Sequence, residues 1–279
     1  TNVIQLVHVN DSIAPVASRD TVYANTVACV IDTVHAKTTF DNVNALGYGL
    51  TDCNTMTLKS VSRSLKHDGA CTDTLVITYT IEDECGNSKK VYQLQRIHDN
   101  VAPVASQYTI YADAVACVND TVQAKTNFTE VNNLGYQLTD CNTMSLKSVA
   151  RSLKHNGACT DTLVITYTIE DACGNTTEVY QLQRIHDNVA PVASTDMIYA
   201  NAVACVSDTV QAKTNFTAVN ALGYNLTDCN AMKLKKVDRN LKHNGACTDT
   251  LVITYTIEDD CGNTTKVYQL QRIHDSLAP

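Results

Sequence analysis

The chain has 279 residues, with 29 acidic against 21 basic side chains, a formal net charge of −8 and a pI near 5.4. An acidic chain lacks the basic surface that displaces counterions from phosphates, which excludes nucleic acid as a partner. No apolar run approaches the roughly 18 residues that cross a bilayer, so we expect no membrane span in this segment.

One phrase ending in Ala-Pro recurs at an interval of 88 residues, at Pro15, Pro103, Pro191 and Pro279. A repeat of this size matches a small autonomous β domain. We expect residues 1–14 to be the last strand and linker of a preceding repeat, 15–102 to be repeat 1, 103–190 repeat 2, and 191–279 repeat 3 with the start of the next linker. The segment then belongs to a longer array, and its first partners are neighbouring repeats.

Each repeat is expected to be built from short strands and one helical turn. In repeat 1 these are strands over 21–24 and 27–31, a helical turn over 40–47, and strands over 56–65, 75–81 and 90–97. The strand over 75–81 places Leu75, Ile77, Tyr79 and Ile81 on one face. The helical turn ends at Gly47, a residue typical of helix C-termini.

The chain has twelve cysteines, four in each repeat, at equivalent positions of the three repeats. Within a repeat they are separated by 24, 18 and 14 residues, whereas structural zinc recruits close pairs. Aromatic residues make up only 6% of the chain and Trp is absent, so each core is small and a covalent supplement is expected. Disulfides supply it, which places the protein in an oxidising, extracellular compartment.

The strand order suggests the pairing. Cys29 and Cys71 should lie at one pole of the sandwich, and Cys53 and Cys85 at the other. Predicted bridges therefore lie within each repeat: Cys29–Cys71, Cys53–Cys85, Cys117–Cys159, Cys141–Cys173, Cys205–Cys247 and Cys229–Cys261. The predicted fold is all-β, a tandem array of three disulfide-stapled Ig-like antiparallel β-sandwich domains, each with one short helical turn.

Three motifs at fixed phase point to a family. The run from Thr78 to Asn87, followed by Asp99-Asn-Val-Ala-Pro-Val104, resembles the tandem Ig-like and HYR-like repeats of Bacteroidota cell-surface proteins, and Thr51-Asp-Cys-Asn54 is similar to another element of them. The resemblance covers all three repeats. It implies a semi-rigid spacer in a cell-surface adhesin or filament, of the gliding-motility and attachment kind exported by the type IX system. End-to-end or laterally associated fibres are the partners it implies.

The same resemblance implies O-glycosylation where Asp precedes Ser or Thr and an aliphatic residue follows. The candidates are Ser12, Thr21, Thr33, Thr74, Thr121, Thr162, Thr209, Thr250 and Ser276. The alternative is that Asp-Thr-Val begins strands, with Asp ending a turn and the β-branched residues favouring the sheet.

An acid precedes each Ala-Pro junction, at Asp11, Asp99, Asp187 and Asp275. Cadherin-type arrays hold Ca²⁺ with similarly placed acids. Calcium needs six or more oxygens, so further acids such as Glu82 and Asp83 would have to converge there. The alternative is that each Asp caps a turn before the rigid proline. We expect no other cofactor.

No arrangement of side chains suggests catalysis, so we expect the segment not to be an enzyme. An array of glycan- or protein-binding modules is one alternative function, and a non-catalytic appendage of a secreted enzyme is another. Exposed rings at Tyr48, Tyr136 and Tyr224 could stack on sugars, unless each ring is buried against the end of its sandwich.

Overall fold

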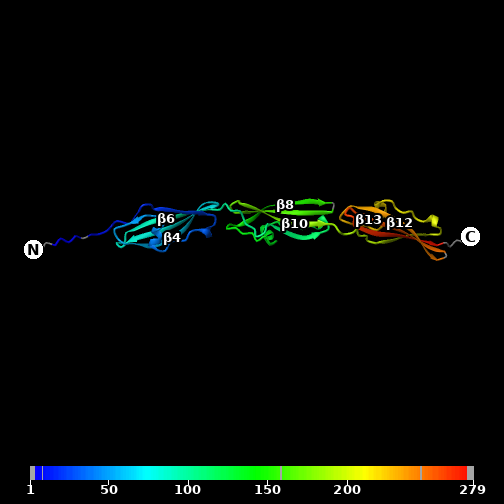
Figure 1. The fold of residues 1–279 in the computed structure, drawn as a ribbon, viewed down its shortest axis with the longest axis horizontal. Coiled ribbons are helices and arrows are strands. Elements are labelled where there is room, and N and C mark those ends of the chain that lie inside the picture. Colours follow the sequence, from blue (N-terminus) through cyan, green and yellow to red (C-terminus); the bar gives the residue numbers. More distant parts are fainter. Residues whose placement is uncertain (1–3, 8, 158, 246, 275–279) are drawn as a thin grey trace. The chain divides into compact units, whose positions relative to one another are not determined.

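The computed structural model describes residues 4–7, 9–157, 159–245 and 247–274. Two compact units are formed by Thr1–Tyr108, Thr126–Ser148 and Tyr167–Val179, and by Thr109–Lys125, Val149–Thr166 and Tyr180–Pro279. Repeat 2 contributes to both units. Figure 1 traces the strands of the three repeats along the chain.

The main elements occur in the same order three times. Repeat 1 contains β1 (Val16–Ala17), β2 (Thr21–Val27), the 3-10 helix η1 (Val30–Asp32), α1 (Phe40–Asn44), β3 (Leu50–Thr51), β4 (Met56–Gly69), β5 (Thr72–Asp83) and β6 (Ser88–His98). Repeat 2 contains β7 (Thr109–Val115), η2 (Val118–Asp120), α2 (Phe128–Asn132), β8 (Met144–Gly157), β9 (Thr160–Asp171) and β10 (Thr176–His186). Repeat 3 contains β11 (Met197–Val203), η3 (Val206–Asp208), α3 (Phe216–Asn220), β12 (Met232–Gly245), β13 (Thr248–Asp259) and β14 (Thr264–His274). The short β1–β3 pair of repeat 1 is replaced by the single bridges Val104–Thr139 and Val192–Thr227 in repeats 2 and 3.

The main sheet of repeat 1 has the order β2-β6-β5-β4, and those of repeats 2 and 3 have the equivalent orders β7-β10-β9-β8 and β11-β14-β13-β12. The β4–β5 and β5–β6 pairs are antiparallel, as expected. In contrast to the expectation, β2 pairs with β6 in parallel. Residues 28–55 carry the chain back to the pole where β2 began, so β2 and β4 run in the same direction at opposite edges of the sheet.

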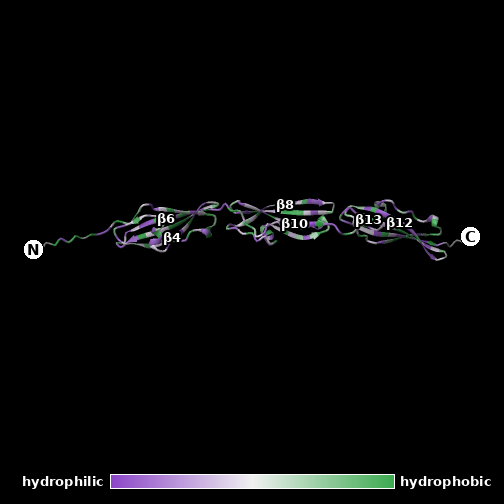
Figure 2. Cartoon of the chain, viewed as in Figure 1, coloured by the Kyte–Doolittle hydropathy of each residue, from purple (hydrophilic) through white to green (hydrophobic). Residues whose placement is uncertain are grey.

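The core lies between this sheet and a thinner second layer. Leu75, Ile77, Tyr79 and Ile81 alternate with more exposed residues along β5 and are buried, as their spacing predicted. They belong to one cluster with three buried residues of the second layer, Val43, Tyr48 and Leu50. Figure 2 shows hydrophobic and hydrophilic residues mixed along the strands. The tandem all-β class is confirmed.

The second layer contains the expected helical turn. Helix α1 begins after Thr39, whose side chain accepts a hydrogen bond from the backbone N–H of Asn42. It buries Val43, and the chain leaves the turn at Gly47 with φ +97°, a conformation that favours glycine. The prediction of one short helical turn in each repeat is confirmed.

The strand expected over 27–31 is wrong. Strand β2 ends at Val27, and η1 follows with Cys29 as its N-cap residue. The backbone N–H of Asp32 donates to Cys29 O, and the hydroxyl of Thr33 donates to Val30 O at 2.7 Å. These local hydrogen bonds satisfy backbone groups that would otherwise pair in the sheet. Cys29 is thereby left outside the sheet, at its pole.

Buried glutamines of β6 fasten the chain that crosses the sheet. Gln95 accepts a hydrogen bond from Val34 N at 2.7 Å and donates to Asn25 O at 2.7 Å. The hydroxyl of Tyr79 donates to Gln93 at 3.0 Å. These polar groups are buried but bonded, so they fix one path for the crossing chain.

Candidate functional site

Four disulfides join cysteines of different repeats. They are Cys29–Cys141, Cys71–Cys173, Cys117–Cys229 and Cys159–Cys261. The predicted pairing within each repeat is therefore wrong for the bridges Cys29–Cys71, Cys117–Cys159, Cys141–Cys173 and Cys229–Cys261. Each repeat is covalently attached to the next at two points.

The assignment of cysteines to poles was correct even though the pairing was not. Cys29, Cys71, Cys141 and Cys173 all line one hollow of about 930 Å³ in the first unit. Strand order could place Cys29 beside Cys71, but it could not show that a second pole lies opposite. The bonded cysteines have Cα atoms 5.6 Å apart for Cys29 and Cys141, well within disulfide reach.

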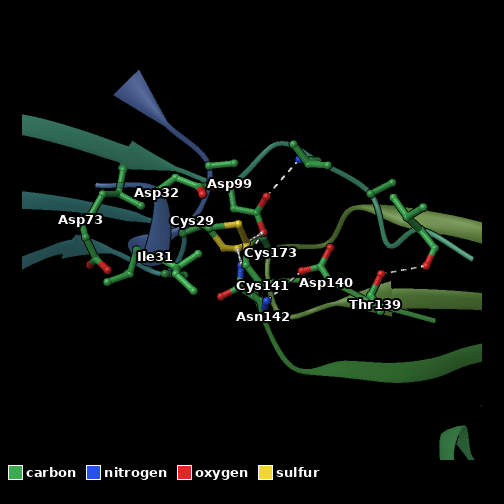
Figure 3. Close-up of a pocket in the computed structure, with 18 residues that line it drawn as sticks. Cys29, Ile31, Asp32, Asp73, Asp99, Thr139, Asp140, Cys141, Asn142 and Cys173 are labelled. Carbon is green, nitrogen blue, oxygen red and sulfur yellow. Dashed lines mark hydrogen bonds between the residues drawn. A yellow bond between two sulfur atoms is a disulfide. The ribbon is translucent and has the colours of Figure 1, made fainter. Parts of the chain in front are cut away.

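The linker acid Asp99 lies beside these bonds (Figure 3). Its side chain is 6% exposed, and Oδ1 accepts a hydrogen bond from Val101 N at 3.0 Å. Its Oδ2 accepts from the amide Nδ2 of Asn142, which also lies 3.6 Å from the sulfur of Cys173. Asn142 therefore connects the carboxylate of the linker to Cys173, which bonds repeat 2 to repeat 1.

A second amide secures the linker backbone. Asn175 Nδ2 donates to Asp99 O at 3.5 Å and to Asp171 Oδ2 at 2.8 Å. Asp171 also accepts from the backbone N–H of Cys173 at 2.7 Å. The turn between β9 and β10 thus holds both the linker and a bonded cysteine.

The second unit repeats this arrangement with Asp187 in the place of Asp99. Asp187 is 5% exposed and accepts from Val189 N at 3.0 Å and from Asn230 Nδ2. Asn230 Nδ2 lies 3.6 Å from the sulfur of Cys261. The same contacts occur at both junctions, so the Asp–Asn–Cys arrangement belongs to the repeat and is not particular to one linker.

Four cysteines of the described chain are free and exposed: Cys53, Cys85, Cys205 and Cys247. The predicted bridges Cys53–Cys85 and Cys205–Cys247 are not formed. The thiol of Cys53 donates to Asp11 Oδ2 at 3.2 Å, and this hydrogen bond raises the pKa of Cys53. Burial raises the pKa of the Cys85 thiol.

The acids proposed for calcium lie in these junctions. Asp99, Asp140 and Cys141 have ligand atoms within 4.8 Å of one another, as do Asp11, Asp52 and Cys53, and also Asp187, Asp228 and Cys229. The sulfur of Cys141 is taken by its disulfide, and both oxygens of Asp99 accept hydrogen bonds from the protein. Burial, and then the charges of Asp99 and Asp171, raise the pKa of Asp140.

The other acids named for calcium do not add ligands in repeat 1. Asp83 accepts hydrogen bonds from Asn87 in its own turn, and Glu82 pairs with Lys59. Asp275 lies outside the described residues. The hydrogen bonds that Asp99 accepts from Val101 N and Asn142 Nδ2 are those of a residue that caps a turn before the proline. Calcium binding at the junctions stays a prediction.

Three glycosylation candidates are poorly placed for modification. Thr33, Thr121 and Thr209 are about 5 to 6% exposed, and each hydroxyl donates to a backbone carbonyl at 2.7 Å. Each also accepts from an arginine of the neighbouring edge strand: Arg63, Arg151 and Arg239. In the folded protein these three hydroxyls are enclosed and hydrogen-bonded, which leaves no access for a glycan. Ser276 lies outside the described residues.

Of the two alternatives for the tyrosines that follow the helical turn, burial of the ring is confirmed and stacking on sugars is wrong. Tyr48, Tyr136 and Tyr224 are 0% exposed. Tyr48 meets Tyr79 edge to face, with ring centroids 6.5 Å apart. Their rings fill the cores instead of a ligand surface.

The residue that sequence reasoning missed is Asn142, with its counterparts Asn54 and Asn230. The signal was present, because Asp-Cys-Asn recurs at identical phase in all three repeats. Its role was hidden because the acid it binds belongs to a linker about 43 residues earlier in the chain.

Comparison with known proteins gives no family. No family model matches the chain, and no curated protein matches it. Among solved structures, human CDH23 repeats EC21-23 are similar at 8% identity and TM-score 0.32, covering 93% of this chain and 100% of that one. Drosophila N-cadherin EC1-4 is similar at 10% identity and TM-score 0.28, covering 81% and 61%. Both TM-scores lie below 0.5, so neither likeness bears on function.

The described residues contain no helix that is both long and apolar enough to cross a membrane.

Proposed function

We propose that this chain is a covalently cross-linked structural segment of an extracellular fibre, in which each repeat is one domain and carries tension to the next. The observation that carries the proposal is the pair of disulfides at each junction, Cys29–Cys141 with Cys71–Cys173 and their counterparts in the second unit. Two bonds restrict a hinge more than one, because they remove rotation about a single attachment point. The proline of each linker stiffens the same joint.

The bonds also shorten the path that force follows. A load applied at both termini can pass along residues 1–29, cross to Cys141, continue to Cys159, and cross to Cys261. This covalent route contains roughly a quarter of the residues. Its length when fully extended is about 3.5 Å for each of them. Strands β2, β8 and β14 lie in this path. The other strands of the main sheets lie outside it and bear no load, so the domains keep their folds under tension.

The finer proposal is a semi-rigid spacer in a bacterial cell-surface adhesin or filament, of the gliding-motility type found in Bacteroidota. Its support is the recurrence of the Asp-Cys-Asn, Cys-Gly-Asn and Asp-x-x-Ala-Pro elements, together with cysteines that need an oxidising compartment. Glycosylation at Ser12, Thr21, Thr74, Thr162 and Thr250 belongs to this finer proposal. An intact mass equal to that of the bare 30.4 kDa chain would remove the glycosylation.

Single-molecule stretching between handles at residues 1 and 279 tests the structural role. Before reduction, we expect the total extension to stop at the length of the short covalent route. After reduction, the full chain should extend, about fourfold further. Full extension of the oxidised protein would contradict the proposal. If the disulfides instead lay within each repeat, each domain of the oxidised protein would unfold in a separate step, and each step would add a short length to the extension.

A further inference from the structure

The main sheet of repeat 3 has a core face and an opposite face, which we call the open face. Buried residues such as Ile253 and Tyr255 of β13 point to the core, and the residues between them point to the open face. The open face of β12 and β14 carries the residues that pair with Thr250, Val252 and Thr254 and with the two alternate residues that follow them. All of these residues belong to the second unit.

The open face of repeat 3 is basic although the chain is acidic. Its cations are Lys233, Lys235, Lys236, Lys242, Lys266 and Arg272, and its acids are Asp238 and Glu258. Six cations against two acids give this face a formal charge of +4, whereas the whole chain has a net charge of −8. The net charge of the chain therefore conceals a surface of the opposite sign.

The acids pair with only three of the six cations. Glu258 contacts Lys233 at 3.4 Å and Lys235 at 2.5 Å, and Asp238 contacts Lys236 at 2.7 Å. The Glu258 side chain is 15% exposed, whereas the two lysines that it contacts are 61 and 49% exposed, so the positive charges lie nearer to solvent. Among the described residues, the other three cations form no ion pair. They are Lys242, Lys266 and Arg272.

Four of the cations form two rows across the sheet. Lys242 and Arg272 flank Thr250 of β13 in one row, and Lys236 and Lys266 form the second row, six residues further along β13. Neighbouring strands lie about 4.8 Å apart, so the two cations of a row have backbones about 10 Å apart. The two rows lie about 20 Å apart along the strands.

An exposed tyrosine lies between the two rows. Tyr199 of β11 is paired with Leu270, and its ring is 76% exposed. The hydroxyl of Tyr199 donates to the sulfur of Met197 at 3.2 Å. The equivalent rings of Tyr23 and Tyr111 are 80% exposed. An exposed aromatic ring offers an apolar surface on which a flat ligand ring can stack.

We propose that the open face of repeat 3 binds a polysaccharide of uronic acids. Its carboxylates contact the two cation rows, where Arg272 can donate two parallel hydrogen bonds to one of them, and a sugar ring stacks on Tyr199. Cations about 10 to 20 Å apart suit a chain of low charge density, whereas a DNA strand carries a phosphate about every 3.4 Å. An acidic peptide is less suited, because peptides add to the free edge of a sheet and the backbone groups of this face are already paired.

This proposal and one glycosylation candidate exclude each other. Thr250 stands between Lys242 and Arg272, and its hydroxyl accepts from Asn244 Nδ2 at 2.7 Å. An O-glycan on Thr250 would cover that cation row. The protein used for binding is therefore first shown by intact mass to carry no glycan.

Repeat 2 supplies a variant of this face that is compatible with the fold. Where repeat 3 has Lys233, Lys236 and Lys266, repeat 2 has Ser145, Ser148 and Glu178. The full chain with Lys233→Ser, Lys236→Ser and Lys266→Glu is compared with the unmodified chain by calorimetric titration with polygalacturonate at low salt. We expect the affinity of the tightest site to fall about tenfold. Added salt should weaken binding of the unmodified chain, because it screens exposed charges.

Single substitutions separate the two kinds of contact. Lys242→Gln should weaken binding about threefold, whereas Lys213→Gln should leave it unchanged, because Lys213 lies on the core side, where its backbone N–H donates to Tyr255. Tyr199→Ala should weaken binding about fivefold at both low and high salt, and Tyr199→Phe should retain it. Circular dichroism checks that each variant is folded.

Neutral dextran, dextran sulfate and single-stranded DNA are titrated in parallel. Failure to bind polygalacturonate, equal binding of neutral dextran, or tighter binding of dextran sulfate or DNA would overturn the proposal. An equal loss with Lys213→Gln would also overturn it. Every residue of the site belongs to one repeat, so these outcomes are independent of the disulfides on which the proposed function depends.

Discussion

Cys29 and Cys141 are bonded although 112 residues separate them and they belong to successive repeats. The second bond, Cys71–Cys173, spans 102 residues at the same junction. Closing a loop of about 100 residues stabilises a fold by about 4.7 kcal/mol in the chain-entropy model. The two bonds share one junction, so the second contributes less than the first and acts mainly by limiting rotation.

The pairing can be read from a single substitution. Cys29→Ser removes one partner, and we expect the thiol that becomes reactive to be that of Cys141. Maleimide labelling under native conditions followed by peptide mapping locates it. The matched control is Cys205→Ser, which alters a free cysteine and should expose no new thiol. A new reactive thiol at Cys71 would instead support bridging within the repeat.

Tyr48 and Tyr79 offer a matched pair of hydroxyl deletions. Among the described residues, the buried hydroxyl of Tyr48 has no hydrogen-bond partner, whereas that of Tyr79 donates to Gln93 and accepts from Lys37 N. Tyr48→Phe should leave stability unchanged or raise it by about 1 kcal/mol, and Tyr79→Phe should lower it by about 1 to 3 kcal/mol. Urea unfolding followed by circular dichroism measures both. A larger loss for Tyr48→Phe would show that its hydroxyl has a partner.

Stability should fall at alkaline pH. Burial, followed by the neighbouring tyrosine, raises the pKa of Tyr48, Tyr136 and Tyr224 above the ordinary value of 10.0. A tyrosine whose pKa is higher in the folded state contributes its full stability below pH 10, and the contribution is lost as the pH rises because the unfolded chain ionises first.

Urea unfolding between pH 8 and 12 measures this loss. The free cysteines are alkylated beforehand, because thiolates exchange disulfides faster at high pH. Absorbance at 295 nm should show that Tyr48, Tyr136 and Tyr224 ionise at a higher pH in the folded protein than in the urea-unfolded chain. Ionisation of these three rings at the same pH in both states would contradict their buried placement.

Asp140 tests whether the junction is a calcium site or a hydrogen-bonded turn. Its raised pKa, which results from burial and then from Asp99 and Asp171, means that its ionised form weakens the fold as the pH rises. Asp140→Asn retains an oxygen to accept from Asn142 N, which Asp140 does at 2.8 Å. We expect the substitution to raise the free energy of unfolding at pH 7 by less than about 1 kcal/mol, seen as a higher melting temperature, and to have no effect below pH 3.

The same measurement is repeated with calcium and with a chelator. If the hydrogen bonds alone hold the junction, neither addition should shift the melting temperature, and Asp113→Asn on an exposed strand should behave like the unmodified chain. A rise with calcium that Asp140→Asn abolishes would establish a calcium site, because a ligand bound only by the folded state stabilises it.

Local sequence patterns predicted the hairpin strands and the helical turn of one repeat, but not the 3-10 helix over Val30–Asp32. Alternation placed Leu75, Ile77, Tyr79 and Ile81 in the core, because β-strands turn successive side chains to opposite faces. Apolar spacing and Gly47 located the helical turn, because both depend on residues only a few positions apart. The expected strand order also indicated that Cys29 and Cys71 share a pole.

What each pole faces depends on contacts between residues far apart in the chain. Cys29 bonds Cys141 and not Cys71, and Asn142 binds Asp99, because the linker brings two poles together across more than 40 residues of chain. The repeats carry their cysteines at identical phase, so the sequence cannot distinguish a bond within a repeat from one between repeats. The choice depends on distances between poles, which no local spacing encodes.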